Sequence, residues 1–101
     1  MQKEASNVFL NNLKRDGIKM TDEYLILKLT EELGEFVQSY LVHERKCRPE
    51  KYLPLPESKK TISKELADVL GLIFVIAETL EIDVEEALIK KWITREWIKE
   101  K

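Results

Sequence analysis

Apolar residues recur every three or four positions along most of this chain, which is the spacing of one face of an α-helix. The first such stretch runs from Ala5 to Leu13. It ends at Asp16 and Gly17, and glycine after a helical pattern is typical of a helix C-terminus because it adopts left-handed backbone angles without strain. The pattern predicts a first helix over about residues 3–15.

The second apolar pattern runs from Leu25 to Leu41. Thr21 stands before it as a suitable N-cap, since a threonine hydroxyl accepts a hydrogen bond from the backbone of the first turn. Asp22 and Glu23 follow, where negative charge opposes the helix dipole. We therefore expect a second helix that begins directly after Thr21.

Periodicity disappears over residues 44–60, where Pro49, Pro54 and Pro56 forbid a continuous helix. We expect a loop here, longer than the usual connection of about 4–6 residues, and a third helix that begins near Thr61. Long loops in compact domains are often lids or substrate contacts, and a loop simply packed against the helices is an equal alternative.

The third helix contains residues 69–77, a run without a polar side chain. A helix that is apolar on all sides must be buried on all sides. Four helices in a chain of 101 residues can hardly cover it, so the pattern predicts a second subunit.

Asp83 and Glu86 resemble a capping box and mark the start of a fourth helix. No stretch shows the alternation of a β-strand or a glycine-rich phosphate loop. The sequence therefore predicts an all-α fold, a four-helix bundle completed by oligomerisation, as a single domain over residues 1–101.

The fourth helix has two unusual faces. Val84 and Leu88 define an apolar stripe, and on a helical wheel Lys91 and Arg95 lie within about 20° of Val84. These two cations are therefore expected to face inward or toward a cleft. A second apolar ridge, suited to a subunit interface, consists of Ile89, Ile93 and Trp97.

Composition narrows the functional classes. A hydrophobic content of 44% excludes disorder, and a net charge of −2 with a pI near 5.5 does not favour a nucleic-acid or anionic-membrane surface. No apolar run reaches the ~18–20 residues that span a bilayer, and the N-terminus lacks a signal-peptide core, so we expect a cytoplasmic protein. One cysteine, Cys47, and one histidine, His43, form neither an internal disulfide nor a zinc site, and no chemistry is assigned to them.

Two acidic pairs carry the most specific signal in the chain. Glu32 and Glu35 lie three residues apart in the second helix, as do Glu65 and Asp68 in the third, so each pair projects from one helix face. Packed face to face, the two helices would gather four carboxylates. Such a set suits a hard cation, Mg²⁺ or alternatively Mn²⁺.

A charged content of 36% makes a solvated acidic helix face the simpler reading of either pair alone. The direction in which the acids point argues against it. Glu32 falls about 20° from Leu25 on the helical wheel, and Glu65 shares a face with Val69 and Leu72. Carboxylates rarely lie within an apolar face without a partner, so a metal site is favoured.

A metal site beside inward-facing cations suits a polyphosphate ligand, because metal ions and basic side chains share the phosphate oxygens. Lys91 and Arg95, with Lys28 beside Glu32, are the candidate substrate-binding cations. No Ser, Thr or Cys nucleophile stands next to a base, so attack by water is the simplest route. Glu31, one step round from the ligand face, is the candidate that holds this water or orients a ligand.

The segments Lys28-Leu-Thr-Glu-Glu-Leu-Gly-Glu35 and Lys64-Glu-Leu-Ala-Asp-Val-Leu70 resemble the paired acidic motifs of the all-α nucleoside triphosphate pyrophosphohydrolases, the MazG-type superfamily. The resemblance covers about residues 24–95. It implies that the four carboxylates bind Mg²⁺ and that the substrate is cleaved between its α- and β-phosphates. It also implies that Glu31, which matches the first glutamate of the motif, assists the metal ligands and is not a primary ligand itself. An asparagine frequent in the family's last helix is missing here, where Trp92-Ile93-Thr94 stands instead.

Two other functions stay open at this stage. Phosphoribosyl-ATP pyrophosphohydrolases have similar motifs, although the histidine that we associate with their second motif is absent after Asp68. A non-catalytic helical oligomer that binds metal is the alternative from a different class. Release of pyrophosphate from a nucleotide separates the enzymes from it. The sequence does not discriminate a dimer from a tetramer.

Overall fold

The computed structural model describes residues 1–99, which form helices joined by turns and irregular segments, with no strand among them. The elements are α1 (Gln2–Arg15), α2 (Asp22–His43), the short 3-10 helix η1 (Pro49–Lys51), α3 (Leu55–Thr79), α4 (Val84–Leu88), the π-helix η2 (Ile89–Ile93) and α5 (Glu96–Lys99). The all-α prediction is confirmed.

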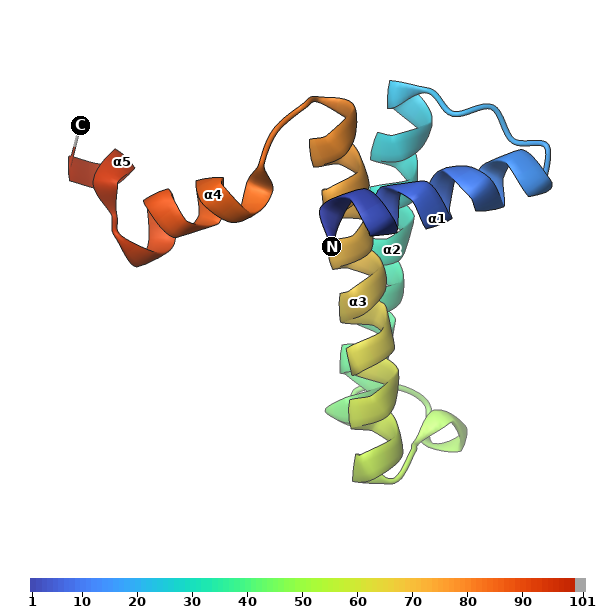
Figure 1. Cartoon of the computed structure of the whole chain (residues 1–101). Helices are drawn as coiled ribbons and strands as arrows, with labels where there is room; N and C mark the ends of the chain where they lie inside the picture. The colour runs from blue at the N-terminus through green and yellow to red at the C-terminus, as the bar shows by residue number, and fades with distance from the viewer. Residues whose placement is uncertain (100–101) are drawn as a thin grey trace.

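Three long helices make the packed part of the molecule. Figure 1 shows α2 and α3 side by side and antiparallel, with α1 lying across them. The small apolar core lies where the three meet. Its buried side chains are Leu13, Leu25, Leu72, Val75 and Ala77.

The three helix-end signals read from the sequence are confirmed. Gly17 has a φ of 70° after α1, and the hydroxyl of Thr21 accepts a hydrogen bond from the Tyr24 amide at 3.0 Å. At the start of α4 the carboxylate of Asp83 accepts from the Glu86 amide at 3.1 Å. The Thr21 and Asp83 side chains satisfy amides that have no partner inside the helix, and the amide of Gly17 donates to the Lys14 carbonyl at the end of α1.

The third helix begins at Leu55, so the expected start near Thr61 is wrong. Pro54 is the N-cap and Pro56 lies in the first turn, where the proline ring is tolerated because first-turn amides have no intrahelical acceptor. The carbonyl of Pro54 accepts hydrogen bonds from the amides of Glu57 and Ser58, each at 3.0 Å. The connection after α2 therefore covers residues 44–54 instead of the expected 44–60, and it contains η1.

The fourth helix is not continuous, so the unbroken α-helix assumed for the helical wheel is also wrong. After α4 the chain widens into η2, where the Thr94 amide bonds to the carbonyl of Ile89 at 2.9 Å, and Arg95 then adopts a φ of 59°. The 100° step of the helical wheel fails across a π turn, so Lys91 and Arg95 leave the Val84 stripe. We call residues 84–99 the C-terminal arm. It extends away from α1, α2 and α3 (Figure 1).

The side chain of Gln2 ties the start of α1 to the turn before the arm. Its amide nitrogen donates to Glu78 Oε2 at 3.0 Å and to the Ile82 carbonyl at 2.7 Å, and its amide oxygen accepts from the Val84 amide at 3.3 Å. This single side chain therefore contacts both ends of the turn that links α3 to α4. It fixes the point at which the arm leaves the packed helices.

The chain exposes more surface than a compact protein of its size. Its accessible area is 8025 Å², against about 6,000 Å² for a compact chain of 11.9 kDa. Its radius of gyration is 16.6 Å, against about 13 Å for a compact domain of this length. Apolar side chains contribute to the excess, since Leu70 is 49% exposed and Trp92 and Ile93 are each 73% exposed. None of the helices in the described part of the chain is long and apolar enough to cross a membrane.

Candidate metal centre

The antiparallel pairing of α2 and α3 brings the four acidic residues of the two motifs together. Glu32 and Glu35 project from α2, and Glu65 and Asp68 project from α3. One carboxylate oxygen from each lies within 4.8 Å of the others. We call these residues the carboxylate cluster. The spacing of three within each pair places both acids of a helix on the face that meets the other helix.

Two oxygens of the cluster are buried without a hydrogen-bond partner in the described part of the chain: Glu32 Oε2 and Glu65 Oε2. Glu32 as a whole is only 9% exposed. A buried carboxylate oxygen without a donor is costly, so these two oxygens lack the partner that would offset their burial. An all-oxygen donor set of this kind is the one preferred by hard divalent cations, and the four residues therefore fit a metal ion.

The acid–base properties of the cluster point the same way. Burial raises the pKa of Glu32, and the neighbouring Glu35 and Asp68 raise it further, while Lys28 lowers it. Burial also raises the pKa of Glu65, with added contributions from Glu35 and Asp68. The protein alone thus disfavours full ionisation of the cluster, and a bound cation would remove that penalty.

Lys28 is the cation that lies nearest to the cluster in the packed helices. Its Nζ is 2.6 Å from Glu31 Oε1 and 3.7 Å from Glu32 Oε1. The hydrogen bond to Glu31 raises the pKa of Lys28. Glu31 itself is exposed and lies outside the cluster, where its carboxylate holds Lys28 beside Glu32.

Lys91 and Arg95 are placed differently from the wheel expectation. Both are exposed, Lys91 within η2 and Arg95 between η2 and α5. Because the C-terminal arm points away from α2 and α3 (Figure 1), one chain does not bring these two cations to the carboxylate cluster. The inward orientation predicted for them assumed an unbroken α-helix.

A cavity opens on each side of the cluster. One, of about 510 Å³, lies between α1 and the α2–α3 pair and has Glu32 and Asp68 in its wall. The other, of about 640 Å³, lies between α2, η1 and the start of α3 and has Glu35 and Glu65 in its wall. We call the second one the η1 cavity. Both fall within the size range of small-molecule sites.

Sequence reasoning missed three polar residues that line the η1 cavity: Ser39, Lys51 and Ser58. Ser39 is buried in α2 and Ser58 in α3, and the Ser58 hydroxyl lies 2.7 Å from His43 Nδ1. Ser39 stands four residues after Glu35, on the same helix face, which was the available signal. Lys51 also lines the cavity and belongs to the stretch that was expected to be a loop.

Comparison with known families agrees with this geometry. The family model described as MazG nucleotide pyrophosphohydrolase domain matches residues 20–97, a span that contains the whole carboxylate cluster and most of the arm. No curated protein and no solved structure matched the chain.

Proposed function

Because this chain belongs to the MazG nucleotide pyrophosphohydrolase family, we propose that it is a Mg²⁺-dependent nucleoside triphosphate pyrophosphohydrolase. The reaction would convert a ribo- or deoxyribonucleoside triphosphate and water into the monophosphate and pyrophosphate. The observation that supports it most directly is the carboxylate cluster, with two buried oxygens that have no hydrogen-bond partner in the described chain.

In this proposal Glu32, Glu35, Glu65 and Asp68 hold the metal. Bound Mg²⁺, or Mn²⁺ in its place, supplies neutralisation of charge on the phosphate oxygens. Placing the four ligands on two packed helices fixes the direction of each carboxylate before substrate binds.

Water is the nucleophile in this proposal, because the described cluster contains carboxylates and no hydroxyl or thiol beside a base. Glu31 has a supporting role, since it holds Lys28 at the edge of the cluster and is itself exposed to solvent. The exposed Glu31 carboxylate is the group proposed to orient the attacking water. Lys28 is then the cation available to a phosphate oxygen on this side.

We also propose that the functional unit is a homo-oligomer, at least a dimer. The chain exposes about 2,000 Å² more than a compact protein of its mass, which is the order of area that each copy buries in an obligate dimer. The arm carries a row of exposed apolar side chains: Leu88, Ile89, Trp92, Ile93 and Trp97. A second copy that covers the arm would also let Lys91 and Arg95 reach its phosphates.

A panel of ribo- and deoxyribonucleoside triphosphates with Mg²⁺ tests the activity. We expect monophosphate and pyrophosphate in equal amounts from at least one substrate, and no product when Mg²⁺ is removed by a chelator. Glu65→Gln keeps the side-chain shape and removes one ligand charge, so it should lose most of the turnover while the helical content stays the same.

Two results would contradict the proposal. Hydrolysis of phosphoribosyl-ATP without hydrolysis of any nucleoside triphosphate would place the chain with the related histidine-synthesis enzymes. Mg²⁺ binding to the cluster without hydrolysis of any nucleotide in the panel would favour a non-catalytic metal-binding oligomer.

A further inference from the structure

The η1 cavity joins the carboxylate cluster to the positive end of the molecule. Glu35 and Glu65 form the part of its wall next to the cluster. Lys51 of η1 and Leu53 form the part furthest along the connection. A ligand bound to a metal in the cluster can therefore extend into this cavity without leaving the protein surface.

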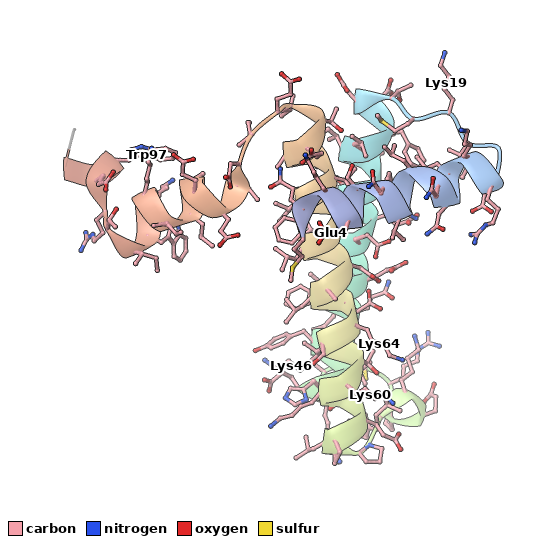
Figure 2. The ribbon with its side chains drawn as sticks, viewed as in Figure 1. Glu4, Lys19, Lys46, Lys60, Lys64 and Trp97 are labelled. Atoms are coloured by element: carbon pink, nitrogen blue, oxygen red, sulfur yellow. The ribbon has the colours of Figure 1, made fainter. Side chains whose placement is uncertain are left out.

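The charge around the cavity is unlike that of the rest of the chain. Residues 44–64 contain seven Lys and Arg and three Glu, a net charge of +4, whereas the whole chain has a net charge of −2. Figure 2 shows Lys46, Lys60 and Lys64 at this end of the α2–α3 pair. A positive field of this kind attracts an anion toward the cavity.

Among the described residues, Lys51 is the only cation that lines the η1 cavity. In the opposite cavity, Lys28 is already bound to Glu31 at 2.6 Å and lies 3.7 Å from Glu32. Lys51 lines the η1 cavity, and within the described residues its ammonium group has no ion pair. A phosphate in the η1 cavity therefore meets the Lys51 charge alone, whereas a phosphate in the opposite cavity shares the Lys28 charge with Glu31 and Glu32.

Two buried serines in the lining of the η1 cavity are hydrogen-bonded to other groups of the protein. The Ser58 hydroxyl donates to the Leu55 carbonyl at 3.1 Å and contacts His43 Nδ1 at 2.7 Å, so it links the end of α2 to the start of α3. The Ser39 hydroxyl donates to the Phe36 carbonyl at 2.7 Å. Because these hydroxyl protons are already used, and the Gln38 amide that also lines the cavity is uncharged, Lys51 is the charged donor available to an anion there.

We propose that the η1 cavity is the subsite for the pyrophosphate end of the substrate, with Lys51 as the side chain that binds its terminal phosphate. This inference rests on the proposed function, since it concerns the same cluster. It assigns a direction to the substrate: the phosphates that leave as pyrophosphate lie toward η1. Lys51 is a binding residue and takes no part in the transfer of protons.

Binding of inorganic pyrophosphate in the presence of Mg²⁺, measured by isothermal titration calorimetry on the full chain, tests the subsite apart from catalysis. Lys51→Ala removes the proposed contact, and we expect it to raise the Kd by about 10-fold or more, as loss of a charge-assisted hydrogen bond does. Lys51→Arg keeps the charge and should retain most of the affinity. Lys60→Ala is the matched control, because Lys60 is exposed in the same positive segment and does not line the cavity.

The subsite is supported if Lys51→Ala weakens pyrophosphate binding and Lys60→Ala changes it by less than about twofold. Equal effects of the two variants, or no effect of Lys51→Ala, would overturn it, because the positive segment would then act only through its general field. Circular dichroism shows whether each variant keeps its helices. Pyrophosphate binding that depends on Lys51 in a protein without hydrolytic activity would support the subsite and reject the proposed function alone.

Discussion

Replacement of Glu32 by glutamine separates the two consequences of the carboxylate cluster, repulsion without metal and ligation with it. Glu32 is the most buried of the four acids, and its Oε2 has no hydrogen-bond partner in the described chain. Glutamine keeps the shape and removes the charge. We therefore expect Glu32→Gln to stabilise the metal-free protein and to remove most of the stabilisation that Mg²⁺ gives.

The size of the first effect follows from the distances. At an effective dielectric constant of 20, two charges 4.8 Å apart interact by about 3.5 kcal/mol, and two charges 3.7 Å apart by about 4.5 kcal/mol. Repulsion of Glu32 by the other three acids of the cluster, less its attraction to Lys28, leaves about 6 kcal/mol of net repulsion if all are charged. Partial protonation reduces this, so we expect a gain of about 1–2 kcal/mol, or about 5–10 °C in Tm.

The second effect has the opposite sign. A ligand that binds only the folded state stabilises it by about 2.7 kcal/mol when its concentration is 100 times its Kd. The wild-type protein should gain this order of stability as Mg²⁺ is added. Glu32→Gln has lost one ligand and should gain much less at the same concentration, so that the order of the two melting temperatures reverses.

Thermal unfolding followed by circular dichroism, with and without Mg²⁺, measures both effects in the same samples. Glu23→Gln is the control, because it removes one charge from α2 at an exposed position outside the cluster. It should leave the Mg²⁺ response unchanged. A Mg²⁺-dependent rise in Tm of wild-type size in Glu32→Gln would refute the assignment of Glu32 as a metal ligand.

Three further predictions concern pH, the arm and assembly. The raised pKa values of Glu32 and Glu65 mean that these two groups bind more protons in the folded protein than in the unfolded one. Their contribution to the metal-free stability should therefore be complete below the ordinary carboxyl pKa and be lost as the pH rises through the raised values, and urea-denaturation midpoints that stay constant over this window would contradict it. Arg95→Lys should lower kcat/KM by more than about twofold, equivalent to roughly 0.4 kcal/mol, because lysine cannot replace a bidentate phosphate contact, and a smaller change would remove Arg95 from the substrate site. Ile93→Glu should lower both the oligomer mass measured by light scattering and the activity, because Ile93 is 73% exposed on the arm. A wild-type protein that is monomeric and fully active at micromolar concentration would show that no partner is needed.

The part of the site that follows from local geometry was predictable from the sequence. A spacing of three residues places Glu32 beside Glu35 and Glu65 beside Asp68 in any α-helix, and the apolar neighbours of each pair showed that both faces point inward. Pairing of the two helices then brings the four acids together. These steps use only helical spacing and the apolar pattern of neighbouring residues, and both can be read from the sequence.

The start of α3 and the break in the fourth helix were not predicted, because both depend on where the backbone enters or leaves the α-helical conformation. Two prolines before Thr61 read as helix breakers, yet Pro54 and Pro56 fall at the one end of a helix that tolerates them. The π turn of η2 has no comparable sequence signal, and it moved Lys91 and Arg95 off the expected face. A helical wheel gives the face of a residue only where the α-helix is unbroken, and the helix that contains Lys91 is interrupted by η2.

The hydrogen bonds of Gln2 have a consequence for the order of folding. They join residues separated by 76, 80 and 82 positions, whereas α2 and α3 follow one another and pair as a hairpin. Closure of the longer loops loses more chain entropy, so we expect the hairpin to form early and the α1 contacts to form late. Pulse-labelled hydrogen exchange should protect Leu72 before Val84, and simultaneous protection would contradict this order. The direction of the arm is then set in the final step of folding, after the carboxylate cluster has already been assembled.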